Sequence, residues 1–277
     1  MRERQSGQDA VPESPRSRGS LTVVGTGIRF GLQTTPEARR AISRADMVLY
    51  LTTDPLADAW VRRLNSSTRS LARHYQLGRR RREAYDAMVE EILDSVRGGL
   101  DVCAVFYGHP GVFVSPSHEA IAGVREMGLP AEMLPSVSAA DCLVADLGID
   151  PGAEGWQAYE ATDFLLHRRN IETTTPLVLW QVSMIGAWHA VNRPVVEGLA
   201  ILAERLGELY GSDHEVVVYQ AGDYPIGGPL IVRVPVSELA DVDVGAMATL
   251  CVPPSGRPER DPEMTSRLRG LHRSTGP

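Results

Sequence analysis

The sequence lacks lysine altogether, so all 28 of its basic residues are arginine, and its acidic residues outnumber them to give a formal net charge of −7. Binding nucleic acid without sequence preference depends on neutralising phosphates, for which an acidic chain is poorly suited. A long apolar run is missing too: the longest, at 177–188, is interrupted by Gln181 and is shorter than the ~20 residues of a membrane-spanning helix. Residues 1–20 are polar, without the apolar core of a secretory signal. We therefore expect a disordered leader at 1–20 and a cytoplasmic protein with neither nucleic acid nor membrane as a partner.

Cysteine is scarce, and the signatures of several enzyme classes are absent. Cys103, Cys142 and Cys251 lie among apolar neighbours without zinc-like spacing, which predicts buried, reduced thiols. The sequence has no Walker phosphate loop, no GxSxG elbow and no HExxH helix, which argues against P-loop nucleotidases, α/β-hydrolases and zinc peptidases. His109 and His118, nine positions apart, are too weak a pattern to indicate a metal site.

Hydrophobic residues make up 43% of the chain, which is typical of a soluble globular protein with a sizeable core. Short apolar runs typical of buried strands alternate with helical patterns. These runs lie at 21–24, 47–51, 102–106, 131–134, 177–182, 215–219, 230–234 and 248–252. Such alternation indicates an α/β fold with a mostly parallel sheet that helices cover. Residues 255–277 are polar and form a predicted C-terminal tail with one weakly helical piece.

Two glycine-containing turns follow predicted strands, Gly25-Thr-Gly27 and Tyr107-Gly-His-Pro-Gly111. Glycine and proline in such turns expose backbone groups and let the chain approach a bound molecule closely. An ordinary strand-to-helix turn has the same composition, so both interpretations stay open. A dinucleotide site is disfavoured, because the glycine spacing departs from the Rossmann pattern and Asp46 precedes the second strand instead of following it.

An arginine-rich segment leads into a predicted amphipathic helix that ends at Gly98-Gly99. Arg81 and Tyr85 are four positions apart, so they share one face if the helix begins by Arg81. One interpretation is a solvated basic loop with Tyr85 in the core. The other is a phenol beside a guanidinium, which favours the phenolate and makes a base from a residue that is otherwise protonated at neutral pH.

An ordered set of segments resembles the tetrapyrrole methylase superfamily of class III methyltransferases. The set consists of the Gly25-Thr-Gly27 loop, Tyr-Gly-His-Pro-Gly-Val-Phe at 107–113, Leu-Pro-Ser-Val-Ser-Ala at 134–139 and Val-Pro-Pro at 252–254. Further segments, at 106–118, 140–147, 159–164 and 179–182, resemble the methyltransferase domain of borosin peptide α-N-methyltransferases. The resemblance covers roughly residues 20–265. Gly-His-Pro stands where corrin and haem-pathway members carry Gly-Asp-Pro, which favours the peptide enzymes.

The resemblance implies two α/β/α domains, at 21–136 and 137–254, with mostly parallel or mixed sheets. It further implies a homodimer, and S-adenosylmethionine, converted to S-adenosylhomocysteine, in the cleft between the domains. The residues that match cofactor positions are Tyr107, His109, Val112, Phe113, Ser138, Ala139, Gln181, Ala221, Gly222 and Thr249. Apolar members of this set suit an adenine and a methyl group, and polar members suit a ribose and a carboxylate.

The implied reaction is methyl transfer to a backbone amide nitrogen, a poor nucleophile because its lone pair is delocalised into the carbonyl. Catalysis needs a base, a group that stabilises charge on the amide oxygen, and close alignment. Tyr85 and Arg81 match the family's catalytic pair, and Tyr75 matches a second active-site tyrosine. Ala72 stands where the family has a further tyrosine.

Fused borosin enzymes carry a clasp and a substrate peptide after this domain. The sequence ends about twenty residues beyond Val-Pro-Pro, so we expect it to act in trans on a separate precursor peptide. Two alternatives stay open: C-methylation of a tetrapyrrole or another small ring, and a non-catalytic binding module of the same fold.

Overall fold

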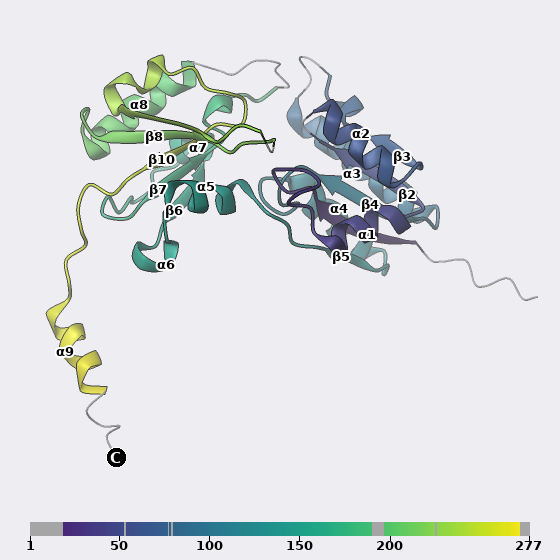
Figure 1. Cartoon of the computed structure of the whole chain (residues 1–277), viewed down its shortest axis with the longest axis horizontal. Helices are drawn as coiled ribbons and strands as arrows, with labels where there is room; N and C mark the ends of the chain where they lie inside the picture. Colours follow the sequence, from purple (N-terminus) through teal and green to yellow (C-terminus); the bar gives the residue numbers. More distant parts are fainter. Residues whose placement is uncertain are drawn as a thin grey trace, which may run out of the picture. The chain divides into compact units, whose positions relative to one another are not determined.

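The computed structural model describes residues 19–52, 54–76, 78, 80–189, 197–224 and 226–271. The predicted leader therefore lies outside the described residues except for its last two positions. The chain divides into two compact units. Unit 1 comprises Met1–Ala139 with Asp223–Pro225, and unit 2 comprises Ala140–Gly222 with Ile226–Pro277 (Figure 1).

Unit 1 is built on a five-stranded parallel sheet with the strand order β3-β2-β4-β1-β5. Its strands are β1 (Ser20–Gly25), β2 (Met47–Leu51), β3 (Thr68–Ser70), β4 (Asp101–Phe106) and β5 (Ala131–Met133). Its helices are α1 (Pro36–Arg44), α2 (Pro55–Leu64), the 3-10 helix η1 (Leu71–His74), α3 (Arg81–Arg97) and α4 (Ser115–Glu126). Each strand returns through a helix, which is why all the strand pairs are parallel.

Helices cover both faces of this sheet. Ile42 of α1 and Val61 of α2 pack in one core with Tyr50 of β2. Ile92 of α3 and Val124 of α4 belong to the core on the opposite face. Burying a side chain of this size contributes about 1.5–3 kcal/mol. The apolar faces predicted from the sequence thus give an α/β/α unit.

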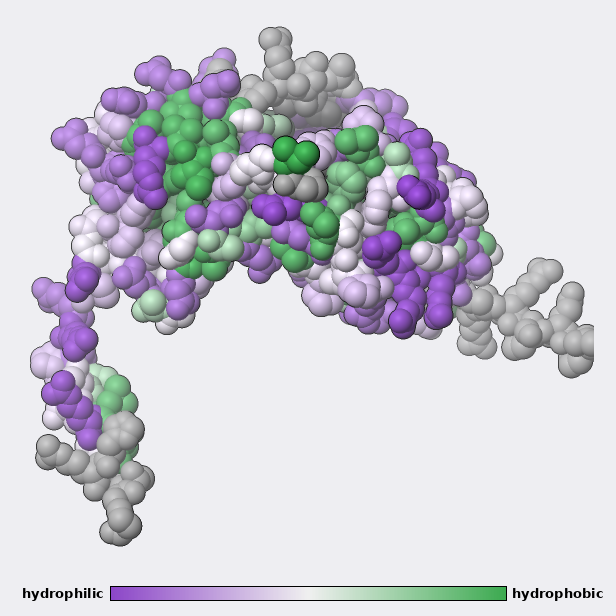
Figure 2. Space-filling model, in the orientation of Figure 1, coloured by the Kyte–Doolittle hydropathy of each residue, from purple (hydrophilic) through white to green (hydrophobic). Residues whose placement is uncertain are grey.

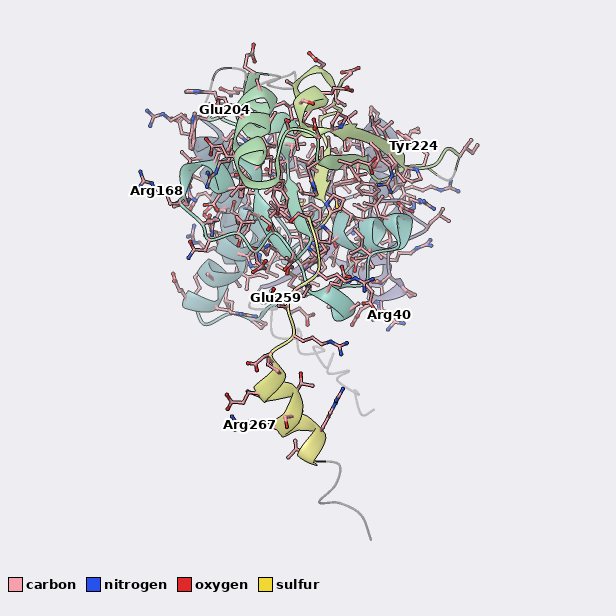
Figure 3. All side chains as sticks on the ribbon, turned by 90° about the vertical axis from the view of Figure 1, so that its left-hand side faces the viewer. Arg40, Arg168, Glu204, Tyr224, Glu259 and Arg267 are labelled. Atoms are coloured by element: carbon pink, nitrogen blue, oxygen red, sulfur yellow. The ribbon has the colours of Figure 1, made fainter. Side chains whose placement is uncertain are left out.

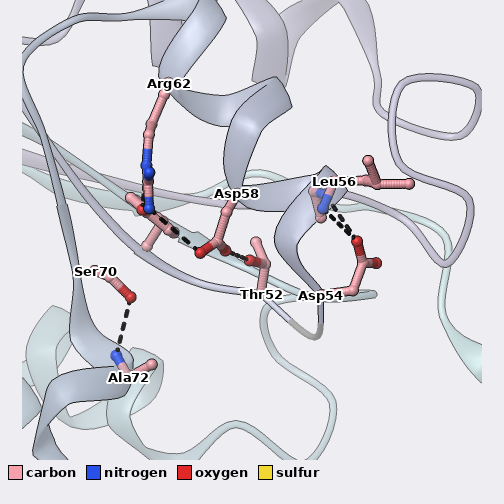
Figure 4. A network of polar contacts seen from close by, with 9 residues as sticks. Thr52, Asp54, Leu56, Asp58, Arg62, Ser70 and Ala72 are labelled. Atoms are coloured by element: carbon pink, nitrogen blue, oxygen red, sulfur yellow. Dashed lines mark hydrogen bonds and ion pairs between the residues drawn. The ribbon is translucent and has the colours of Figure 1, made fainter.

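Local sequence signals set the helix starts in unit 1. Thr35 accepts the backbone N–H of Ala38 at 3.1 Å and is followed by proline, as the sequence predicts for the start of α1. Asp54 caps α2 in the same way, accepting the N–H groups of Leu56 and Ala57 (Figure 4). α3 begins at Arg81, which meets the condition for Arg81 and Tyr85 to share a face.

Unit 2 is built on a mixed sheet with the order β6-β7-β10-β8-β9, in which β6 and β7 are parallel and the other pairs antiparallel. Its strands are β6 (Gln157–Glu160), β7 (Leu177–Trp180), β8 (Glu215–Gln220), β9 (Leu230–Pro235) and β10 (Thr249–Val252). Its helices are α5 (Ala139–Leu147), α6 (Pro151–Glu154), α7 (Ala161–Leu166), η2 (Val182–Met184), α8 (Glu197–Tyr210), η3 (Val236–Asp241) and α9 (Pro262–Leu271). The predicted α/β class with parallel and mixed sheets is confirmed.

The main core of unit 2 joins α7, α8 and η3 to the sheet, where Leu202 of α8 packs with Leu179 and Val218 of the strands. Charged side chains such as Glu204 on α8 point outward (Figure 3). α5 is tied to the sheet by the Tyr219 hydroxyl, which donates to Asp146 Oδ2 at 2.7 Å.

The predicted C-terminal tail contains α9, whose apolar residues Met264, Leu268 and Leu271 are exposed along one side (Figure 2). Residues 272–277 of the tail lie outside the described residues. No described helix combines the length and the apolar character that crossing a bilayer requires.

Candidate functional site

Three predicted motifs lie at one edge of the unit 1 sheet. β4, β1 and β5 are adjacent and parallel, so the segments that follow them emerge together at their carboxyl ends, the edge at which open α/β sheets bind ligands. Gly27 and Gly108 exchange two backbone hydrogen bonds, of 3.2 and 3.1 Å. The Ser136 hydroxyl donates to the Gly25 carbonyl at 3.3 Å. The Gly25-Thr-Gly27 loop therefore contacts both the Tyr107–Phe113 turn and the segment that leads to Ser138.

The contact between the two glycine turns leaves no room for a side chain. A Cβ on Gly25 would lie 2.0 Å from the carbonyl oxygen of Gly108. Gly27 and Gly108 have φ angles of +71° and +68°, in the left-handed region that favours glycine. The close approach of the two backbones therefore requires glycine in these turns, which the sequence alone could not distinguish from an ordinary strand-to-helix turn.

Two histidines hold the backbone of this turn, His109 within it and His118 on α4. His109 Nδ1 accepts the N–H of Gly111 at 3.0 Å, so the proton of the neutral ring is on Nε2. His118 Nε2 donates to the carbonyl of Gly111 at 2.9 Å. Together they fix the peptide units on both sides of Gly111, ahead of Val112 and Phe113.

Val112 and Phe113 project from this fixed turn with 38% and 47% of their surface exposed. Exposed apolar side chains at the carboxyl edge of a sheet are suited to the wall of a ligand site. Ser138, in contrast, is buried, and Ala139 begins α5. The structure brings the unit 1 candidates to one edge of the sheet.

Tyr107 has a partner that the sequence did not indicate. Its hydroxyl donates to Asp223 Oδ1 at 2.7 Å, although the two residues are 116 positions apart. Asp223 belongs to the short segment that the fold assigns to unit 1. The sequence around Asp223, Ala-Gly-Asp-Tyr, resembles any polar turn, so no local signal marks it.

The unit 2 candidates also gather at one sheet edge. β10 is antiparallel to β7 and β8, so its first residue, Thr249, lies beside the ends of those strands. Gln181 follows β7, and Ala221 and Gly222 follow β8. Thr249 is buried. In the described part of the chain, the side-chain oxygen of the neighbouring Gln220 is buried without a hydrogen-bond partner and packs against Gly245.

Gln181 corrects one expectation. The sequence predicts that it lies within a buried strand at 177–182, but β7 ends at Trp180 and Gln181 adopts the left-handed conformation, with φ +59° and ψ +38°. Among the described residues, the non-glycine residues with positive φ are Phe113 and Gln181, both candidate cofactor residues. Such conformations cost about 1–3 kcal/mol each and are typical of functional sites.

Replacing Gln181 by glycine is therefore expected to separate stability from binding. Relief of the left-handed strain offsets the entropy cost of glycine, so the free energy of unfolding should change by less than about 1 kcal/mol. Affinity for S-adenosylhomocysteine should fall, because the amide is lost. Chemical denaturation and calorimetric titration measure the two quantities. A variant that unfolds much more easily, or binds as before, contradicts this prediction.

The predicted catalytic residues come together at the start of α3. Arg81 Nη2 donates to the Tyr85 hydroxyl oxygen at 3.2 Å. The ring of Tyr75 meets that of Tyr85 edge to face, with centroids 6.2 Å apart. Burial, the charge of Tyr85 and a hydrogen bond to Tyr85 raise the pKa of Tyr75 above its usual value, although Arg81 opposes this. Burial and the neighbouring Tyr85 thus favour the protonated form of Tyr75, and the Tyr85 oxygen accepts from Arg81.

A second arginine–tyrosine pair shows what a structural pair looks like in this unit. Arg62 Nε donates to the Tyr50 hydroxyl at 2.8 Å, and Tyr50 is 1% exposed in the core. Arg62 also contacts Asp58, which accepts a hydrogen bond from Thr52 (Figure 4). Tyr85 differs because it is only partly buried and its neighbour is a second tyrosine.

The model of the tetrapyrrole (corrin/porphyrin) methylases matches residues 20–240. The chain belongs to this family. Its relatives include the methyltransferase/ribosomally synthesized cyclic peptide gymnopeptides precursor gymMA1 of Gymnopus fusipes, 40% identical over 90% of this chain and 60% of that protein. The omphalotin A precursor ophMA of Omphalotus olearius is 40% identical over 91% of this chain and 62% of that protein.

This tetrapyrrole methylase family member thus spans about 60% of the length of those relatives. Among solved structures, uroporphyrin-III-C-methyltransferase from Thermus thermophilus has a TM-score of 0.62 at 20% identity, covering 86% of this chain and 93% of that one. The enzyme complexed with S-adenosyl homocysteine has a TM-score of 0.58 at 20% identity, covering 85% and 97%. At such identity the likeness shows the fold alone. The predicted resemblance to the superfamily and to the borosin proteins is confirmed.

Proposed function

We propose that this chain is an S-adenosylmethionine-dependent methyltransferase that methylates backbone amide nitrogens of a peptide. The observation that carries the proposal is the Arg81–Tyr85 hydrogen bond of 3.2 Å with Tyr75 alongside. It occurs in a chain 40% identical to methyltransferase/cyclic peptide precursors. The proposed catalytic residues are Tyr85, Arg81 and Tyr75.

The candidate cofactor residues fit the chemistry of S-adenosylmethionine. This cofactor supplies a methyl group on a positively charged sulfur. In unit 1, Val112, Phe113 and Ala139 would pack against its apolar parts, and Ser138 and Tyr107 would meet polar atoms. The strained backbone of Phe113 and the crowded glycine turns support a built binding surface.

The unit 2 candidates complete the proposed set. Gln181 and Thr249 would contribute further hydrogen bonds, and Gly222 would let the ligand approach the backbone. His109 would act on the cofactor through the turn that it holds.

Tyr85 is placed to receive the amide proton. In the proposed step the amide N–H bond would break and its proton would pass to the Tyr85 oxygen in its phenolate form. The nitrogen would bond to the methyl carbon as the bond from that carbon to the cofactor sulfur breaks and S-adenosylhomocysteine leaves. The positive charge of Arg81 stabilises the phenolate before transfer and negative charge on the amide oxygen during it. Tyr75, whose ring meets that of Tyr85 edge to face, would hold the Tyr85 ring in place.

The relatives support a peptide as the substrate, because they are described as cyclic peptide precursors as well as methyltransferases. We propose that a precursor peptide binds this chain and that methylation proceeds in trans. The homodimer stays a prediction. The uroporphyrin-III-C-methyltransferase structures are 20% identical to this chain and show only that the fold is shared, so they do not favour a ring substrate.

Mass spectrometry tests this proposal directly. Incubation with S-adenosylmethionine and a separate precursor peptide encoded beside the chain is expected to add the mass of one CH2 per methylation. Fragmentation should place each increment on a backbone nitrogen. Methylation on side chains or on carbon would reject the amide assignment, and an unmodified peptide would reject a peptide substrate in trans. A parallel incubation with a tetrapyrrole tests the alternative that the chain methylates a ring instead of a peptide.

A further inference from the structure

Glu91 of α3 has an unusual set of neighbours for a carboxylate. Its side chain is 9% exposed, and two arginines and a histidine contact it. Arg73 Nη2 lies 2.6 Å from Oε2 and His74 Nε2 lies 2.7 Å from the same oxygen. Arg69 Nη1 lies 3.2 Å from Oε1. Although burial opposes it, hydrogen bonds with His74, Arg69 and Arg73 and the charge of Arg73 hold the pKa of Glu91 below its usual range.

All three partners come from one short segment. Arg69 lies in β3, and Arg73 and His74 lie in η1, immediately before Tyr75. β3 has three residues and pairs only with β2 among the described strands, so the backbone ladder holds this segment at one side alone. Leu71 is its buried apolar residue, and Tyr75 itself is 37% exposed.

The position of Tyr75 next to Tyr85 therefore depends on how this segment is attached to α3. Glu91 and Tyr85 are both on α3, so the carboxylate and the phenol belong to one rigid element. Arg69, Arg73 and His74 of the segment meet the carboxylate six positions, less than two turns, beyond the phenol. Removing the carboxylate would leave Arg69 and Arg73 near each other without their counter-charge and His74 without its hydrogen-bond partner, which favours displacement of the segment.

We propose that Glu91 is a positioning residue that holds the Arg69–His74 segment against α3 and so keeps Tyr75 in contact with Tyr85. The inference rests on the proposed function for its catalytic consequence. Its structural part, attachment of the segment, holds whatever the substrate is.

The chain offers a matched control on the same helix. Glu90 is the neighbouring residue, carries the same charge and forms an ion pair with Arg97 at 2.6 Å. Its side chain is 59% exposed, and its partner lies on the same helix. Exposed pairs of this kind contribute little to stability. Glu90→Ala therefore removes a carboxylate from α3 without detaching the segment.

The first measurement is amide hydrogen exchange of residues 68–76 by mass spectrometry. Exchange is expected to accelerate by about tenfold or more in Glu91→Ala and to match the wild type in Glu90→Ala. Glu91→Gln keeps the shape of the side chain and guards against a general loss of fold; it should show the same change to a smaller degree. Unchanged exchange in both Glu91 variants would overturn the proposal.

The second measurement is a double-mutant cycle on methyl transfer with Glu91→Ala and Tyr75→Ala. If Glu91 acts through Tyr75, each variant lowers kcat with little change in the KM for peptide, and the double variant is no slower than the slower single one. Losses that multiply in the double variant would show that Glu91 supports the fold generally, and would overturn the positioning role.

The two measurements also separate this proposal from the proposed function. A chain that methylates no peptide, but loses protection of residues 68–76 in Glu91→Ala, rejects the function and retains the attachment by Glu91. A chain that methylates peptide, but exchanges normally in Glu91→Ala, retains the function and rejects the attachment.

Discussion

Replacing Tyr85 by phenylalanine is expected to lower methyl transfer to the peptide by about 10²–10⁴-fold, the usual contribution of a positioned general base. The change removes only the hydroxyl that accepts from Arg81 at 3.2 Å. It keeps the ring that meets Tyr75 edge to face, so the packing at the start of α3 should persist. Without the oxygen, the amide proton has no acceptor at this position.

Cofactor binding distinguishes this loss from a loss of structure. Tyr85 is not among the proposed cofactor residues, so the affinity for S-adenosylhomocysteine should stay within about twofold of the wild type. The binding free energy then changes by much less than the 1.4 kcal/mol of a tenfold change in affinity. Single-turnover rates and calorimetric titration give the two values. A variant that methylates at the wild-type rate would exclude Tyr85 as the base.

Tyr50→Phe is the matched control for this experiment. It removes a hydroxyl that also accepts from an arginine, Arg62 at 2.8 Å, but in the core between the sheet and α2. Losing that hydrogen bond should cost about 1 kcal/mol of stability and leave turnover unchanged. If Tyr50→Phe lowers turnover as strongly as Tyr85→Phe, the loss of activity reflects stability and not chemistry.

The sequence predicts much of the site because its signals there are local. The strand-turn patterns before Gly25 and Tyr107 give the carboxyl edge of a parallel sheet, and the four-residue spacing of Arg81 and Tyr85 gives their contact once α3 begins at Arg81. Periodicity and turn composition act over a few residues, so they are visible without the fold.

The features that the sequence does not reveal depend on tertiary structure. Asp223 contacts Tyr107 across 116 positions, and Glu91 contacts Arg73 and His74 from a different segment. The left-handed conformation of Gln181 has no signal either, since glutamine does not favour it and only the surrounding structure imposes it. The apolar pattern extends the predicted strand to Val182 because hydrophobicity continues where the strand hydrogen bonds stop.

Replacing Gly25 by alanine is expected to have the largest effect on the cofactor site as a whole. The added Cβ would lie 2.0 Å from the Gly108 carbonyl oxygen and 2.8 Å from Pro110 Cδ and Ser136 Cβ. A backbone carbonyl cannot rotate away as a side chain can, so the two turns must separate. Overpacking typically costs 1–3 kcal/mol, and we expect about 3 kcal/mol here because backbone must move.

Separating the turns also breaks the reciprocal hydrogen bonds of Gly27 and Gly108, which set the direction of the segment leading to Val112 and Phe113. Affinity for S-adenosylhomocysteine should therefore fall at least about tenfold, beyond what the loss of stability explains at a temperature where the variant is still folded. Thermal unfolding and calorimetric titration provide both quantities.

Gly228→Ala serves as the control, because a Cβ there meets nothing within 4 Å and the backbone is outside the left-handed region. Its effect on stability should stay within about 0.5 kcal/mol, with cofactor affinity unchanged. If Gly25→Ala binds S-adenosylhomocysteine as tightly as Gly228→Ala does, the glycine turns do not shape the cofactor site. The proposed unit 1 binding surface would then have to be abandoned, even if methylation persists.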